Sequence, residues 1–213
     1  MLNENEIIED LGAELYDQHE TDTDDVDFIL SVIGEQPKKV LEVCCGSGRI
    51  LVPLTKAGHD VSGFDIDVSM LDKIPTKATG ITNIKWSKAD AVLADWGTGF
   101  DVVVLAGNIL FNIVSDMEYK KAQELFVQKA AAALVPGGYI YLGYSPWAPN
   151  GRTLTRAGQS CEDDGSIVWS WEGSDDDGNF EKDALTAGSF DEETGILKFI
   201  RFFEQSLKSG RTL

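Results

Sequence analysis

The stretch LEVCCGSGR, residues 41–49, decides the fold of this chain. It continues a short apolar run and leads into residues 48–58, so we expect a turn from a buried strand into a helix. Gly46 and Gly48 let the backbone turn tightly and approach a ligand closely. Two glycines alone are weak evidence, because a strand-to-helix turn without a ligand has the same pattern.

Outward from this turn, strands and helices alternate. Residues 48–58 and 117–138 predict helices, and residues 69–78 predict a weak helix broken at Pro75. Near-continuous Val, Leu and Ile runs between helices indicate a parallel sheet covered on both faces, a doubly wound, Rossmann-like α/β fold. The predicted strands are residues 39–45, 60–66, 83–89, 100–107 and 139–145.

Different patterns flank this core. Two amphipathic helices precede it, one ending near Tyr16 and one around residues 28–33 that ends before Gly34. Three β-type runs follow it, separated by the turn-like segments DDDGN and DEETG, and predict an antiparallel meander over residues 167–173, 179–190 and 195–207. We therefore expect one compact domain with three parts: lid helices (1–36), a cofactor-binding core (37–146) and an antiparallel β extension (147–213). An exposed meander edge could pair with a second copy to form a homodimer.

Composition excludes several classes of function. Lys and Arg number 18 against 36 Asp and Glu, a net charge of −18 that repels nucleic-acid phosphates. Three cysteines, two of them adjacent, form neither a disulfide framework nor a metal site and favour a reducing compartment. The first residues do not resemble a signal peptide, and no apolar run reaches the ~18 residues of a membrane span. We expect a cytoplasmic protein without nucleic-acid or membrane partners.

Ligands of doubly wound sheets bind beyond the carboxyl ends of the strands, which directs attention to the loops after residues 45, 65, 90 and 107. Asp65 can accept hydrogen bonds from both ribose hydroxyls of a nucleoside; the alternative is a helix N-cap, a role we give to Asp67. Asp90 could accept from the exocyclic amine of a purine, or be an exposed turn residue. Backbone groups of residues 106–108 could face the cleft, or form a plain strand-to-loop transition.

The series EVCCGSGR, GFDID, ADA, FDVVVLAGN and LVPGGY resembles, in order and spacing, the class I S-adenosylmethionine-dependent methyltransferases, and looks most like their small-molecule branch. The resemblance implies that the glycine turn surrounds the methionine part of the cofactor and that Asp65 holds the ribose. It also implies that Ile66 packs on adenine, that Asp90 and Ala91 reach the adenine amine, and that Tyr16 lies near the cofactor's carboxylate. The implied cofactor-binding residues are Tyr16, Glu42, Cys44, Gly46, Gly48, Arg49, Asp65, Ile66, Met70, Asp90, Ala91, Ala106, Gly107 and Asn108.

Two features depart from that family. Cys44 stands where the family has its first loop glycine. Relatives usually continue past the meander into another helix and strand pair, whereas this sequence ends at GRTL, which leaves closure of the substrate pocket open.

The predicted reaction is methyl transfer to a nitrogen or oxygen of a small molecule, with S-adenosylhomocysteine as product. Such a reaction needs mainly positioning and desolvation, and we assign no catalytic residue. His19 is expected to be solvated, His59 to be structural, and the thiols of Cys44 and Cys45 to pack rather than react. Four aromatic residues could stack around an acceptor or simply pack: Tyr144, Trp147, Trp169 and Trp171.

Three other functions are weighed. A nicotinamide-dependent dehydrogenase usually has a third glycine where this chain has Leu51. A nucleic-acid methyltransferase typically has prolines after the fourth strand, where this chain reads Asn108-Ile-Leu-Phe111. A non-catalytic protein that binds S-adenosylmethionine would retain Asp65 and remains an alternative.

Overall fold

The computed structural model describes residues 4–144, 169, 171–174, 178, 180–191 and 196–206. The chain divides into two compact units, Met1–Ser145 and Pro146–Leu213. The boundary lies where the alternation of strands and helices in the sequence gives way to β-type runs. The antiparallel extension, however, forms a compact unit separate from the core. The reason is that, in the described part of the chain, its strands pair with one another and form a sheet of their own. The division into lid, core and extension stays a prediction.

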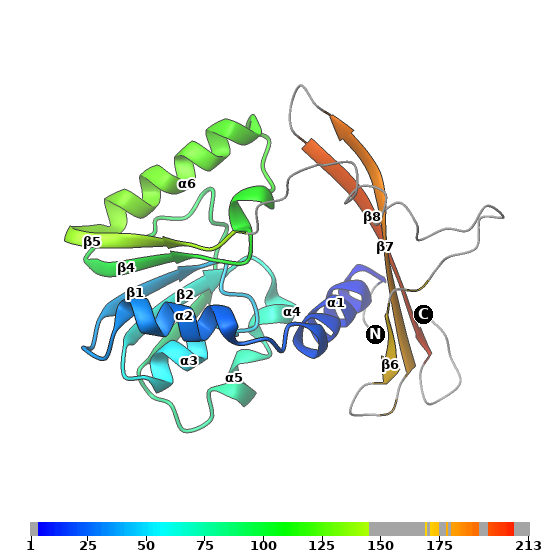
Figure 1. The fold of residues 1–213 in the computed structure, drawn as a ribbon, viewed down its shortest axis with the longest axis horizontal. Coiled ribbons are helices and arrows are strands. Elements are labelled where there is room, and N and C mark those ends of the chain that lie inside the picture. The colour runs from blue at the N-terminus through cyan, green and yellow to red at the C-terminus, as the bar shows by residue number, and fades with distance from the viewer. Residues whose placement is uncertain are drawn as a thin grey trace. The chain divides into compact units, whose positions relative to one another are not determined.

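The first unit contains a five-stranded parallel sheet in the order β3-β2-β1-β4-β5, which confirms the doubly wound fold (Figure 1). Strand order reverses between β1 and β4, so a crevice is expected beyond their carboxyl ends. The strands are β1 (Lys39–Val43), β2 (Asp60–Asp65), β3 (Ile84–Lys88), β4 (Phe100–Leu105) and β5 (Leu134–Leu142).

Helices cover both faces of this sheet. In Figure 1, α6 lies over one face, and α2 and α3 lie under the other. Strand residues alternate between the two faces: Val102 packs in one core cluster with α2 and α3, and Val103 in the other with α6. The helical segments are α1 (Glu4–His19), α2 (Asp24–Ile33), α3 (Leu51–Lys56), α4 (Val68–Leu71), α5 (Ile74–Lys77), the 3₁₀ turn η1 (Ile109–Phe111) and α6 (Tyr119–Ala133).

Three predicted boundaries are wrong. The helix expected over residues 69–78 breaks at Asp72 and Lys73, which cap α4 and α5, and not at Pro75, which lies in the first turn of α5, where a missing N–H costs nothing. The helix expected to end near Tyr16 continues to His19. The helix expected to reach Gly138 ends at Ala133, and β5 already begins at Leu134, which pairs with Phe100 of β4. Strand pairing therefore overrides the Pro-Gly-Gly stop signal, and those residues form an irregularity inside β5, where Gly137 has a φ of 87°.

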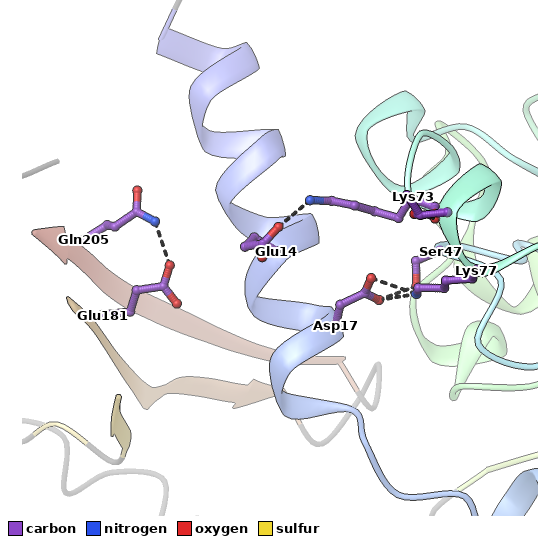
Figure 2. Close-up of polar contacts among 8 residues, drawn as sticks. Glu14, Asp17, Ser47, Lys73, Lys77, Glu181 and Gln205 are labelled. Atoms are coloured by element: carbon purple, nitrogen blue, oxygen red, sulfur yellow. Dashed lines mark hydrogen bonds and ion pairs between the residues drawn. The ribbon is translucent and has the colours of Figure 1, made fainter. Parts of the chain in front are cut away.

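The second unit is the predicted antiparallel meander, in the order β6-β7-β8. Its strands are β6 (Trp171–Ser174), β7 (Phe180–Asp191) and β8 (Ile196–Ser206). Gln205 of β8 donates a 2.6 Å hydrogen bond from Nε2 to Oε1 of Glu181 on β7, and both side chains are buried (Figure 2). Predicted strand residues 167, 168, 170, 179, 195 and 207 lie outside the described residues.

Of the helices in the described part of the chain, none combines the length and the apolar character needed to cross a membrane.

Candidate functional site

A cavity of about 290 Å³ lies at the carboxyl ends of the parallel strands. Its walls come from the loops after β1, β2, β3 and β4, the four places where the sequence analysis expects a ligand. Gly48 and Asn108 are absent from its lining. The other twelve predicted cofactor-binding residues lie on it: Tyr16, Glu42, Cys44, Gly46, Arg49, Asp65, Ile66, Met70, Asp90, Ala91, Ala106 and Gly107.

The loop after β1 turns by placing alternate residues in the left-handed region. Cys44, Gly46 and Gly48 have φ values of 57°, 51° and 79°. Cys44 therefore adopts a left-handed conformation that favours glycine, although it carries a side chain. Gly48 serves packing rather than the cavity, because a Cβ there would lie 3.1 Å from the Ile74 side chain.

Asp65, the last residue of β2, is bonded to the glycine turn. Its Oδ2 accepts a 2.8 Å hydrogen bond from the Gly46 N–H, and its Oδ1 accepts a 2.9 Å bond from the Asp67 N–H. Because a carboxylate offers about four lone-pair sites, each oxygen keeps one for a further donor. Two neighbouring hydroxyls, as on a ribose, match this acceptor set. Asp67 is the N-cap of α4, as predicted, and accepts from the Ser69 N–H at 2.9 Å.

Glu42 of β1 carries an unpaired oxygen into the cavity. Its side chain is buried, and burial raises the pKa of the carboxyl well above its ordinary value. Its Oε2 has no hydrogen-bond partner among the described residues. A buried polar atom without a partner is costly, so this position suits a donor supplied by a ligand, such as the ammonium group of a methionine moiety.

Arg49 joins the glycine turn to the two N-terminal helices. It forms a bidentate ion pair with Asp25 of α2, at 2.7 and 2.6 Å, and its Nε donates to the Tyr16 hydroxyl at 3.4 Å. Hydrogen bonds from Arg49 lower the pKa of the Asp25 carboxyl. The sequence analysis missed Asp25, because an acidic residue in the first turn of a helix ordinarily needs no partner elsewhere.

Helix α1 is also held by an α1 clamp, defined as Glu14, Asp17, Ser47, Lys73 and Lys77. Figure 2 shows Glu14 paired with Lys73, and Asp17 facing Ser47 and Lys77. Asp17 Oδ1 accepts from Ser47 Oγ at 2.5 Å and from Lys77 Nζ at 2.7 Å. The clamp connects α1 to the glycine turn, through Ser47, and to α5, and its only sequence signal is the i, i+3 spacing of Glu14 and Asp17.

The remaining wall comes from the loops after β3 and β4. Asp90 Oδ1 accepts from the Val92 N–H at 2.8 Å, so Asp90 is a turn residue that also faces the cavity. Asn108 has a φ of 59°, and its N–H donates to the Gly143 carbonyl at 3.4 Å. Nine lining residues were not predicted, because most are apolar and such residues carry no chemical signal: Cys45, Ile50, Ala89, Val92, Ile109, Asn112, Ile113, Val114 and Phe126.

Neither of the two thiols that line the cavity is a good nucleophile. Burial raises the pKa of the Cys44 thiol to about 12, and it raises that of Cys45 further. His59 is buried just before β2, at the opposite end of the sheet from the cavity, and its Nδ1 accepts from the Lys38 N–H at 3.2 Å. The described residues contain no cluster of three or more His, Cys, Asp or Glu that could hold a metal.

Tyr144, the candidate aromatic residue in the described part of the first unit, does not line the cavity. Tyr144 stacks edge-on with Phe111, with ring centroids 6.5 Å apart. Trp169 lies under Lys182, whose Nζ is 5.5 Å from the ring centroid. Trp171 is in β6. Trp147 lies outside the described residues, and the described part of His19 is its backbone, at the end of α1.

Comparison with known proteins agrees with this geometry. Residues 40–138 match the model of a methyltransferase domain. A ubiquinone biosynthesis O-methyltransferase from Chelativorans sp. is 25% identical over 106 residues, which cover 49% of this chain and 39% of that protein. A 23S rRNA (uracil(1939)-C(5))-methyltransferase from Aeromonas salmonicida is 28% identical over 118 residues, covering 47% of this chain and 27% of that protein. The chain thus spans less than half the length of either relative.

A solved structure extends the likeness in fold. The sugar N-methyltransferase from Streptoalloteichus sp. aligns with a TM-score of 0.66 at 16% identity, covering 93% of this chain and 73% of that one. Together, the strand order, the position of the cavity and the family match lead to one conclusion. Over residues 40–138 the chain resembles a methyltransferase domain, and its parallel sheet has the doubly wound strand order.

Proposed function

We propose that this chain transfers the methyl group of S-adenosylmethionine to a nitrogen or oxygen of a small molecule. The observation that carries the proposal is the pairing of Asp65 with the glycine turn. Its carboxylate is held by the N–H groups of Gly46 and Asp67 and keeps one acceptor site on each oxygen, on the wall of a cavity at the switch point of the sheet.

The residues of this chain would bind the two ends of the cofactor separately. Asp65 would accept from the ribose hydroxyls, and Asp90 would accept from the adenine amine beside the exposed side chain of Ile66. Glu42 would accept from the ammonium group, which would give its unpaired Oε2 a partner. Tyr16 and Arg49 line the cavity on the side of the N-terminal helices.

When bound, S-adenosylmethionine supplies an electrophilic sulfonium methyl group. The protein then needs chiefly to orient the acceptor and exclude water. The raised pKa of Cys44 argues against covalent catalysis by that thiol. A neutral amine acceptor would need no general base, whereas a hydroxyl acceptor would benefit from one.

A small-molecule acceptor is supported by the net charge of the chain, by one relative and by one structural neighbour. One of the relatives above is an O-methyltransferase of ubiquinone biosynthesis, and a structural neighbour is a sugar N-methyltransferase. The net charge of −18 opposes binding to a phosphate backbone. We place the reaction in the cytoplasm on the strength of two free, adjacent thiols, Cys44 and Cys45.

The test is calorimetric titration of the full chain with S-adenosylmethionine, S-adenosylhomocysteine and NAD. We expect micromolar-range binding of both adenosyl ligands and no binding of NAD. Asp65→Ala should weaken binding by about 2–3 kcal/mol, or ~30- to 150-fold, because two hydrogen bonds to a carboxylate are lost. Asp60→Ala, at the other end of the same strand, is the matched control and should bind like wild type. Folded wild-type protein that binds neither adenosyl ligand would refute the proposal.

A second assay separates the alternatives. Release of S-adenosylhomocysteine is measured with a panel of amino sugars and phenols and, separately, with ribosomal RNA fragments. Turnover with a small molecule supports the proposal. Turnover with RNA alone would favour a nucleic-acid methyltransferase. The observation behind this alternative is the similarity to the rRNA methyltransferase. Tight binding with no turnover on any acceptor would favour a non-catalytic binding protein.

A further inference from the structure

Lys129 of α6 makes contacts unusual for a helix-surface lysine. Its ammonium group donates three hydrogen bonds to backbone carbonyls of one loop: to Ala91 at 3.0 Å, to Val92 at 2.6 Å and to Ala94 at 2.7 Å. An ammonium group has three N–H donors, so this loop uses all of them. The charge also lies 5.6 Å from the ring centroid of Trp96, a distance at which a cation–π interaction stabilises it.

The loop that Lys129 holds is a single turn of backbone between β3 and β4. The N–H groups of Leu93 and Ala94 donate to the Asp90 carbonyl at 3.2 and 2.7 Å. Asp90 Oδ1 accepts from the Val92 N–H at 2.8 Å and so caps the start of the turn. In a longer helix, the carbonyls of this turn would accept from N–H groups of the next turn. Because this turn is isolated, those donors are missing, and the ammonium group of Lys129 replaces them.

The first residues of this turn also line the cavity. Asp90, Ala91 and Val92 line it, and Lys129 does not. The Ala91 carbonyl accepts from Trp96 Nε1 at 2.9 Å as well as from Lys129, so both of its lone pairs are used within the protein. No hydrogen bond to Asp90 Oδ2 is found within the described part of the chain. That oxygen is therefore the acceptor that this wall can offer to a ligand.

We propose that Lys129 is a positioning residue of the cofactor site: by holding the carbonyls of Ala91, Val92 and Ala94 it orients the Asp90 carboxylate toward the exocyclic amine of a bound adenine. This inference rests on the proposed function, since it assumes an adenosyl ligand. The role requires a tripod of donors on a flexible stem, which lysine provides. The planar fork of arginine does not reproduce that geometry, and methionine removes the donors altogether.

The experiment compares Lys129→Met, Lys129→Gln and Lys129→Arg with wild type and with Lys121→Met. Lys121 lies on the same helix, is exposed and has no role at the cavity, so its variant is the matched control. Binding is measured for S-adenosylhomocysteine and for S-inosylhomocysteine, in which an oxo group replaces the amine. Hydrogen exchange of the Val92, Leu93 and Ala94 amides is followed in the ligand-free proteins.

In wild type and Lys121→Met we expect the adenosyl ligand to bind more tightly than the inosyl ligand. In Lys129→Met the dissociation constant of the adenosyl ligand should rise about tenfold, that of the inosyl ligand should rise less, and the loop amides should exchange faster. In Lys129→Gln, whose amide has two N–H donors, the preference for the adenosyl ligand should lie between those of wild type and Lys129→Met. Lys129→Arg should not restore the preference. Asp90→Ala should remove most of the preference by itself, so that adding Lys129→Met to it changes little.

The outcomes that overturn the inference differ from those that overturn the proposed function. If wild type binds neither ligand, the proposed function fails and the inference fails with it. If wild type binds but Lys129→Met keeps the full preference for adenine over hypoxanthine, only the inference fails. An equal loss for both ligands in a folded Lys129→Met or Lys129→Gln variant would show a general structural role and would also refute it.

Discussion

Removing the Asp17 carboxylate from the α1 clamp should loosen α1 by a predictable amount. Asp17→Ala removes an acceptor for the hydroxyl of Ser47, a fully buried residue, and an ion pair with Lys77 at 2.7 Å. A hydrogen bond to a charged group contributes about 1.5–3 kcal/mol, and a partly exposed ion pair contributes less than about 1 kcal/mol. Because water can replace part of both interactions when α1 lifts, we take about 2 kcal/mol as the loss, a ~30-fold rise in the opening equilibrium.

The helix should nevertheless remain mostly docked. The ion pair between Glu14 and Lys73 remains in place. The Arg49 contacts with Tyr16 and Asp25 are also untouched by the substitution. The expected result is faster local opening of α1 with little change in the global unfolding of the core.

Hydrogen exchange of the α1 amides measures this opening directly. Asp10→Asn is the matched control, since Asp10 is an exposed acid on the same helix. The difference between Asp17→Ala and wild type should shrink at about 1 M salt, where the Debye length is ~3 Å and the ion pair is screened. Exchange rates of α1 that match wild type in Asp17→Ala, or that rise equally in Asp10→Asn, would refute the clamp.

Two further predictions concern stability. Burial raises the pKa of Glu42, so the folded state holds that proton more tightly than the unfolded state; its stabilising effect is present at low pH and is lost as pH rises through the folded pKa. Glu42→Gln does not titrate, so its unfolding free energy relative to wild type should rise as the pH increases above about 5 in urea titrations without ligand, and a flat difference would contradict the assignment. Gly63→Ala would place a Cβ 2.9 Å from both Cys45 Cβ and Leu51 Cδ1, and should cost about 1–3 kcal/mol in the same assay. Gly12→Ala, with open space around it, should not destabilise, and equal losses in the two variants would show that the close approach at Gly63 is not the cause.

The candidate site residues at the ends of strands could be predicted from the sequence. Asp65 ends the second apolar run, and Asp90 follows the third, so a parallel sheet brings both to one edge whatever the rest of the chain does. Gly46 could also be predicted from the sequence, because a strand that leads directly into a helix needs a tight turn. These positions follow from periodicity of 2 and 3.6 residues, which is local information.

Residues whose role depends on a distant partner could not be predicted from the sequence. Asp25 bonds to Arg49, Asp17 to Lys77 and Lys129 to the carbonyls of Ala91, Val92 and Ala94. These partners are 24, 60 and up to 38 positions apart in the sequence. On a helix surface each of these side chains resembles an ordinary solvated charge. Only the packed arrangement of helices against the sheet shows that they have partners.

The sequence by itself therefore determined the α/β fold, the sheet edge at which the cavity lies and the acidic residues that line it, because hydrophobic periodicity and strand ends are encoded over a few neighbouring residues. The tertiary structure decided where α6 ends and β5 begins, which wall of the cavity is apolar, and which charges hold α1 and the loop after β3. Those features arise from pairing and packing between segments far apart in the chain, where the free energy of contact outweighs local preference.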